Sequence, residues 1–221
     1  RLGTHPRLAH MMLSSVKLQQ PYHACLLASL LTEKDIFPAD SAKSYDIHER
    51  VNVIQALRPG ANRKHKTPGI DIQQCRRILH TADDFFRRLR QNIKQPAKEA
   101  RKNIDSGLSG VLLACAYPDR IAKQRHKNEA RYLLSNGKGA SIPEYLQHRL
   151  YEYLAVAKLD GRQGEASIYL AAEISAQQLQ DYFADNIRQT ETVEWNEEQQ
   201  RVEAKQTTAI GKIILQQTRI T

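Results

Sequence analysis

The period of the hydrophobic pattern changes near Pro118, and this change constrains the fold more than any other feature of the sequence. Before it, apolar residues recur at helical spacing, most clearly over Asp71–Ile93, where one stripe repeats every 3.6 residues. After it, short alternating segments are separated by turn residues, which is typical of β-strands. The sequence therefore predicts an α+β protein, with a helical bundle over residues 1–117 and a small β-barrel over residues 118–221.

Several stretches of the first part predict helices. The Asp71–Ile93 helix carries arginines on the flank opposite its apolar stripe, namely Arg76, Arg77, Arg87, Arg88 and Arg90. Further helices are expected to start near Leu8, Pro21, Asp46 and Val111. A basic loop over residues 58–66 and a charged linker over residues 94–105 separate helices.

The second part predicts short strands. Residues 131–142 form a hairpin with Asn136-Gly137 at its turn. Further strands are expected over Tyr151–Leu159, Ser167–Ile174, Glu191–Trp195, Arg201–Gln206 and Ile210–Leu215. A short helix capped by Ser175 precedes the last three. Many short strands with one late helix predict a closed or partly open barrel.

Positive charge is concentrated in the first part of the chain. Residues 1–129 contain 23 Lys and Arg against 12 Asp and Glu, a balance of +11. Residues 130–221 contain 10 against 12, a balance of −2, and the two balances sum to the +9 of the whole chain. This asymmetry favours contact with a polyanion, of which nucleic acid is the commonest. The alternative is a basic, solvated helix surface without a ligand.

Cysteine usage and the absence of long apolar runs limit where the chain works. Cys25, Cys75 and Cys115 each have apolar neighbours, which predicts reduced, buried thiols and a cytoplasmic location. The longest apolar run, Val111–Ala116, is far shorter than the ~20 residues that span a bilayer, so no membrane partner is expected. The chain opens without Met or a signal peptide, and we expect it to be a fragment of a longer protein.

Motifs for catalysis are absent from the sequence, which contains no phosphate-binding GxxxxGK[ST] loop, no HExxH and no GxSxG. We therefore expect no catalytic residue, no metal site and no cofactor in this chain. Binding chemistry remains. Basic side chains flank the first predicted strands and can neutralise phosphates, namely Arg120, Lys123, Arg125, Arg131 and Lys138. Asn136 either contacts a phosphate or a base edge, or serves only as a turn former.

Four blocks of sequence carry a family resemblance. They are Leu2–Met12, Gly107–Ala122, Arg131–Ala140, and Thr192–Trp195 with Ile210-Gly211. In this order they resemble the HrpB-type ATP-dependent helicases, a family of bacterial DEAH-box helicases, although residues 35–66 resemble it less. The resemblance implies a ratchet-like, helicase-associated helical domain over residues 1–117. It also implies that the barrel over residues 118–221 is similar to an oligonucleotide/oligosaccharide-binding (OB) fold.

The resemblance further implies a role for the chain. The parent protein would carry motor domains that use ATP and Mg to move on RNA or DNA, and this region would cap them and leave a channel for a single strand. Arg131, Ser135, Asn136 and Lys138 would then face the strand or a motor domain. We therefore expect an accessory nucleic-acid-binding region. The alternative is a non-catalytic clamp or interaction module that docks the motor domains or a partner protein, and a stand-alone enzyme has no support.

Overall fold

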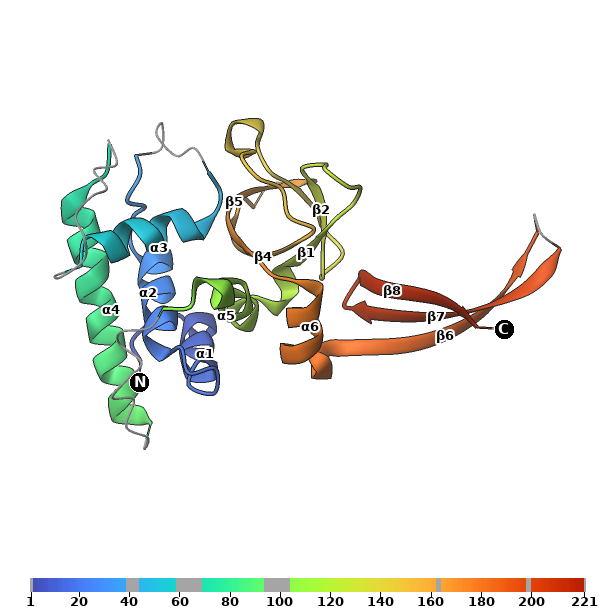
Figure 1. The fold of residues 1–221 in the computed structure, drawn as a ribbon, viewed down its shortest axis with the longest axis horizontal. Helices are drawn as coiled ribbons and strands as arrows, with labels where there is room; N and C mark the ends of the chain where they lie inside the picture. The colour runs from blue at the N-terminus through green and yellow to red at the C-terminus, as the bar shows by residue number, and fades with distance from the viewer. Residues whose placement is uncertain are drawn as a thin grey trace.

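A computed structural model describes residues 2–38, 44–58, 69–93, 104–161, 164–197 and 200–220. The molecule is elongated, with helices at one end, a β-barrel in the middle and a three-stranded sheet that extends away at the other end (Figure 1). The predicted α+β order is therefore confirmed. The basic loop expected at residues 58–66 and the linker expected at 94–105 lie almost entirely outside the described residues.

The helical region is built around the contact between its second and fourth helices. Its elements are α1 (Pro6–Ser14), α2 (Pro21–Thr32), α3 (Ile47–Ala56), α4 (Ile72–Asn92) and α5 (Ser109–Ala116). The helix expected over Asp71–Ile93 is thus confirmed as α4, and the Asp71 carboxylate caps it by accepting a hydrogen bond from the Gln74 amide at 2.9 Å. Its apolar stripe packs on α2, where the rings of Phe86 and Tyr22 meet edge to face at 5.4 Å.

The short helix α5 joins the helical region to the barrel. It is apolar on all sides, and Val111, Leu112, Leu113 and Ala114 are fully buried. A helix that is apolar all round needs neighbours all round, and α5 has α1 and α2 on one side and the strands β4 and β5 on the other. Gly110 allows this approach, because a Cβ there would lie 1.9 Å from the Glu173 carbonyl oxygen at the end of β5.

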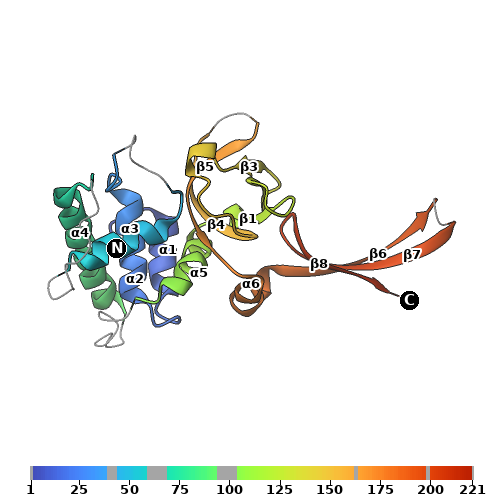
Figure 2. The ribbon, with the colours of Figure 1, turned by 45° about the horizontal axis from the view of Figure 1, so that its top comes forward.

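Five strands close into the barrel. They are β1 (Ile121–Gln124), β2 (Arg131–Leu134), β3 (Gly139–Ser141), β4 (Tyr153–Leu159) and β5 (Ala166–Glu173). Their order is β1-β2-β3-β5-β4, with β1 returning to β4 and with β3 parallel to β5. The barrel lies between the helices and the three-stranded sheet (Figure 2). Tyr132, Leu134, Leu154 and Ile168 fill the interior. The predicted 131–142 hairpin is confirmed as β2 and β3, and the topology is OB-like.

The helical region also reaches β5 directly through its backbone. Tyr45 and Asp46 precede α3, and the Tyr45 carbonyl accepts a hydrogen bond from the Ala171 amide at 2.9 Å. Asp46 and Ala171 form a parallel bridge. The side chain of Tyr45 is buried in the barrel cluster, and its hydroxyl donates to the Arg149 carbonyl. This segment therefore ties the start of α3 to the middle of a barrel strand.

The last three strands do not belong to the barrel, which corrects the expectation for residues 191–215. After α6 (Ala176–Tyr182), the strands β6 (Ile187–Asn196), β7 (Arg201–Ile210) and β8 (Ile213–Ile220) form an antiparallel sheet of their own. The physical reason is that pairing of β1 with β4 already closes the barrel and leaves no free edge. The expected Ser175 cap is confirmed, since Ser175 and Gln178 form a capping box at α6.

The proposed division into domains at residues 117 and 118 stays a prediction. The elements change from helix to strand there, but one apolar cluster continues across the boundary. Leu112 and Leu113 share it with Tyr153 and Leu170 of the barrel. Among the residues that the structure describes, no helix is long and apolar enough to cross a membrane.

We predict that Gly110→Ala destabilises the protein by roughly 1–3 kcal/mol, because the added methyl group must push α5 away from the Glu173 carbonyl. Urea denaturation measures the change. Gly161→Ala is the matched control, because a Cβ at Gly161 meets nothing within 4 Å. Equal loss of stability in the two variants would show that the contact between α5 and β5 is not tight.

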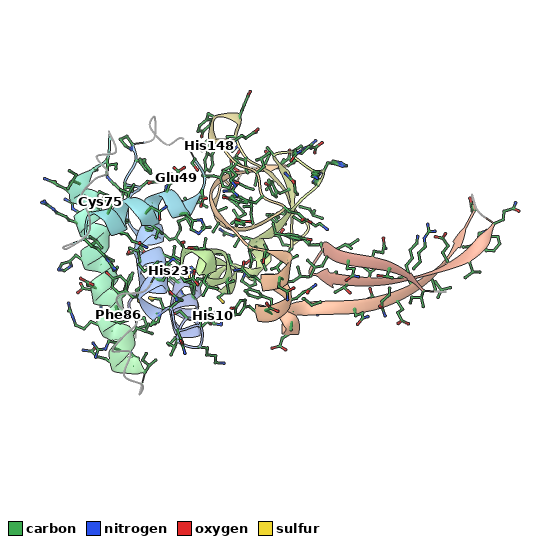
Figure 3. The ribbon with its side chains drawn as sticks, in the orientation of Figure 1. His10, His23, Glu49, Cys75, Phe86 and His148 are labelled. Atoms are coloured by element: carbon green, nitrogen blue, oxygen red, sulfur yellow. The ribbon has the colours of Figure 1, made fainter. Side chains whose placement is uncertain are left out.

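His23 generates a second prediction. It lies fully buried in α2 beside α5 (Figure 3), with its Nε2 3.1 Å from the Ser109 hydroxyl. Burial, with the charge of nearby His48 as a smaller cause, lowers the pKa of His23 to about 4. In the unfolded chain, the His23 imidazole has its ordinary pKa of 6.5. The folded state therefore loses stability as pH falls from about 6.5 towards 4, by on the order of 3 kcal/mol.

The free energy of unfolding, measured at a series of pH values, checks this predicted loss of stability. His23→Gln is the control, because the glutamine amide still faces Ser109 but does not titrate. We expect the wild-type protein to lose more stability than the variant between pH 6.5 and 4. Parallel pH profiles of the two proteins would assign the acid sensitivity to other groups.

Candidate nucleic-acid interface

The seven predicted binding residues all lie on or beside the first three barrel strands, but they do not form one surface. They are Arg120, Lys123, Arg125, Arg131, Ser135, Asn136 and Lys138. Arg125 and Arg131 lie together at the mouth of the barrel. Most of the others lie on the side that faces the β6–β8 sheet. Whether any of them contacts nucleic acid stays a prediction.

Arg125 and Arg131 form an exposed basic cluster, which we call the mouth cluster. The Arg125 amide donates to the Arg131 carbonyl at 2.9 Å, and the Arg125 guanidinium lies over Gly139, 2.7 Å from where a Cβ would be. Arg131 Nε lies 3.2 Å from the carboxylate of Glu165, the last residue of the β4–β5 loop. The exposed Lys127 is in the β1–β2 loop. OB folds bind oligonucleotides with these two loops and strands β2 and β3, so the cluster occupies the expected place.

Lys123 and Ser135 form hydrogen bonds with other parts of the protein. Lys123 donates to the Ile214 carbonyl of β8 at 2.7 Å, and its ammonium lies 5.4 Å from the Tyr153 ring. Ser135 is buried, and its hydroxyl donates to the Pro118 carbonyl at 2.6 Å. The Ser135 carbonyl accepts from the Lys212 amide at 2.9 Å. Both residues therefore hold the β7–β8 turn against the barrel.

Arg120 packs at the connection between α5 and β1. Its guanidinium lies 4.8 Å from the Tyr117 ring and donates to the Ala157 carbonyl at 3.2 Å. Arg7 of α1 contacts the same ring at 5.5 Å and pairs with Asp119 at 2.5 Å. These contacts join α1, the connection and β4, which gives Arg120 a role in packing.

Asn136 and Lys138 form the tip of the β2–β3 hairpin. The Asn136 side-chain oxygen accepts a hydrogen bond from the Lys138 amide at 2.9 Å, and Gly137 between them has φ +89°. This geometry supports Asn136 as a turn former. The Lys138 side chain is exposed at the tip.

The seven binding residues predicted from the sequence do not include a second basic surface, which is the outer face of α4. Its five arginines are all exposed, namely Arg76, Arg77, Arg87, Arg88 and Arg90. Asp84 offsets part of this charge through its pair with Arg87 at 2.8 Å. The helical period shows the arginines opposite the apolar stripe, so the signal was present in the sequence. A basic helix face by itself does not distinguish a binding surface from a solvated one, which is why the sequence could not select it.

Side chains that could bind a metal ion do not cluster in the described part of the chain. No group of three or more His, Cys, Asp or Glu side chains there could hold a metal ion. A pocket of about 460 Å³ between α1, α5 and α6 is lined in part by Cys115. Burial raises the pKa of that thiol, which makes it a poorer nucleophile.

Comparison with known proteins identifies the class. No family model matches the sequence. The ATP-dependent RNA helicase HrpB of Escherichia coli K12 is 34% identical over 113 residues, which cover 49% of this chain and 14% of the relative. A crystal structure of the E. coli DExH-box NTPase HrpB matches 100% of this chain and 23% of its own at a TM-score of 0.71 and 26% identity. A second HrpB crystal structure matches 99% at a TM-score of 0.70 and 23% identity, which supports the fold alone.

With its helical region and OB-like barrel, the chain is similar to an accessory region of helicases. More narrowly, the chain is similar to a C-terminal region of the bacterial HrpB-type DEAH-box helicases, which confirms the resemblance carried by the four sequence blocks. The chain spans only 14% of the curated relative and 23% of the solved one.

We predict that Gly211→Ala loosens the attachment of the sheet to the barrel. Gly211 has φ +57°, and a Cβ there would lie 2.2 Å from the Ser135 carbonyl oxygen. We expect hydrogen exchange of β8 amides to speed up about tenfold or more, while exchange in β4 stays unchanged. Exchange in β8 that matches the wild type would mean that the turn is not held by Ser135.

Proposed function

We propose that this chain is an accessory nucleic-acid-binding region of an ATP-dependent DEAH-box helicase and helps form a channel for a single strand over the motor domains. The observation that carries the proposal is the mouth cluster. Arg125 and Arg131 are exposed beside the two loops with which OB-like barrels bind oligonucleotides. The likeness to HrpB supports the helicase context.

The chemistry of the cluster favours the phosphate backbone over the bases. Guanidinium groups form charge-assisted hydrogen bonds with phosphate oxygens and displace counterions, which gives affinity without sequence preference. Glu165 competes with phosphate for Arg131, since the two lie 3.2 Å apart in an exposed pair. The basic outer face of α4 adds a positive field to the same chain.

The activity of the parent protein belongs to segments outside these residues. On this proposal ATP and Mg bind to the motor domains, and the present chain contributes no catalytic group. Because the curated relative is named as an RNA helicase, single-stranded RNA is the first ligand to test, with DNA beside it. The reduced cysteines fit the cytoplasm, which also remains part of the proposal.

A second candidate is a clamp or interaction module that docks the motor domains. The observation that favours it is the contact of Lys123 and Ser135 with the β6–β8 sheet, where the Lys123 ammonium donates to the Ile214 carbonyl and the Ser135 carbonyl accepts from the Lys212 amide. In that case the basic surfaces would not bind nucleic acid. The two candidates differ in whether the isolated chain binds nucleic acid.

Fluorescence anisotropy of labelled single-stranded RNA and DNA at several salt concentrations tests the proposal. We expect Arg125→Ala and Arg131→Ala each to weaken binding and to reduce the slope of log affinity against log salt by about 0.7, the value for one phosphate contact on a single strand. Glu165→Gln should strengthen binding, because it removes the carboxylate that competes for Arg131.

Arg188→Ala is the control, because it removes an exposed arginine on β6, away from the mouth cluster. If it weakens binding as much as the cluster variants do, the contact is a diffuse charge effect. No binding at low salt, together with docking to the motor domains, would favour the clamp.

A further inference from the structure

One face of the β6–β8 sheet presents apolar side chains near its free end. Residues directly opposite in antiparallel strands share a face. The register pairs Trp195 with Val202 and Val193 with Ala204, and Ile220 lies opposite Ala204. Val193, Trp195 and Val202 are 69%, 60% and 62% exposed. We call these five residues the tip patch.

None of the residues that the structure describes covers the tip patch. The sheet is attached at its other end, where the Lys212 amide donates to Ser135, and from there it extends away from the barrel and the helices (Figures 1 and 2). A group of adjacent, largely exposed apolar side chains, one of them tryptophan, is typical of a protein contact surface.

The charge around the tip patch limits the kinds of partner that could bind to it. Residues 191–203 contain five glutamates and one arginine, a balance of −4 in a chain of +9. Glu203 is on the opposite face, where Lys205 and Arg219 lie 3.5 and 3.6 Å from it. Glu191 shares the face of the patch and Glu197 follows the strand, and both are exposed. This acidic border repels phosphates and the same border of a second copy, and it favours a protein surface with basic side chains.

The solved relative is much longer than this chain, and its additional length is a candidate source of a partner surface for the tip patch. That HrpB structure matches the whole of this chain, sheet included, yet this chain covers only 23% of it. The other 77% (100 − 23) of that solved chain lies outside the matched region. We propose that the tip patch docks on the remainder of the same helicase polypeptide, against an apolar surface bordered by basic residues. This inference rests on the proposed function.

Thiol labelling tests it. Trp195→Cys places a thiol in the tip patch, and Gln217→Cys places one at an exposed position on the opposite face. Alkylation by N-ethylmaleimide is followed by mass spectrometry of the peptide that contains each thiol, in the 221-residue chain and in the complete helicase polypeptide. We expect the thiol at position 195 to react about tenfold or more slowly in the complete polypeptide, relative to the thiol at position 217.

Trp195 is the single tryptophan of the 221-residue chain, so its fluorescence gives a second measurement on the unmodified protein. In the isolated chain we expect emission typical of an exposed indole and strong quenching by acrylamide. Buried emission would contradict the exposed patch.

Three results would overturn the proposal. If the labelling rate at position 195, relative to that at position 217, were equal in the two polypeptides, the patch would have no partner within the helicase. Protection of the isolated chain by single-stranded RNA would identify nucleic acid instead. Protection that grows with the concentration of the isolated chain would identify a second copy. RNA affinity measured by anisotropy is a separate readout, because Trp195 is remote from the mouth cluster. Failed strand binding and failed docking are therefore distinguishable.

Discussion

The packing of α5 against the barrel is the contact on which the rest of the structure depends. This helix has no polar face, so it is stable only when protein surrounds it on every side. Gly110 brings it so close to β5 that a methyl group would not fit without a shift of the backbone. The helices and the barrel consequently share one apolar cluster, and neither can be moved without opening it.

The positive charge of the chain is divided between surfaces of different kinds. Arg120 and Lys123 are stacked on tyrosine rings and hydrogen-bonded to carbonyl groups, so their charge stabilises packing. Arg125 is exposed and lies over a glycine, which leaves its guanidinium accessible. A count of basic residues near the first strands cannot separate these cases. The difference lies in contacts with residues that are distant in sequence, such as Tyr153 and Ile214, which are about 30 and 90 positions from Lys123.

Local sequence was enough to predict elements whose signals are local. The 3.6-residue stripe predicted α4, Asn136-Gly137 predicted the β2–β3 hairpin, and Ser175 predicted the start of α6. The family resemblance supplied the OB-like character of the barrel. The separate sheet could not be predicted, because its strands alternate as barrel strands do. Only the pairing of β1 with β4 shows that the barrel has no place for them.

The segment that carries Tyr45 gives the barrel a second backbone connection to the helices. Its carbonyl is hydrogen-bonded to Ala171 in the middle of β5, and Asp46, the next residue, caps α3. A pull on β5 is therefore transmitted along hydrogen bonds and covalent backbone to the first turn of α3, without passing through side-chain packing. The barrel and the helical region are therefore connected through the backbone as well as through the shared apolar cluster, so a displacement of one should be passed directly to the other.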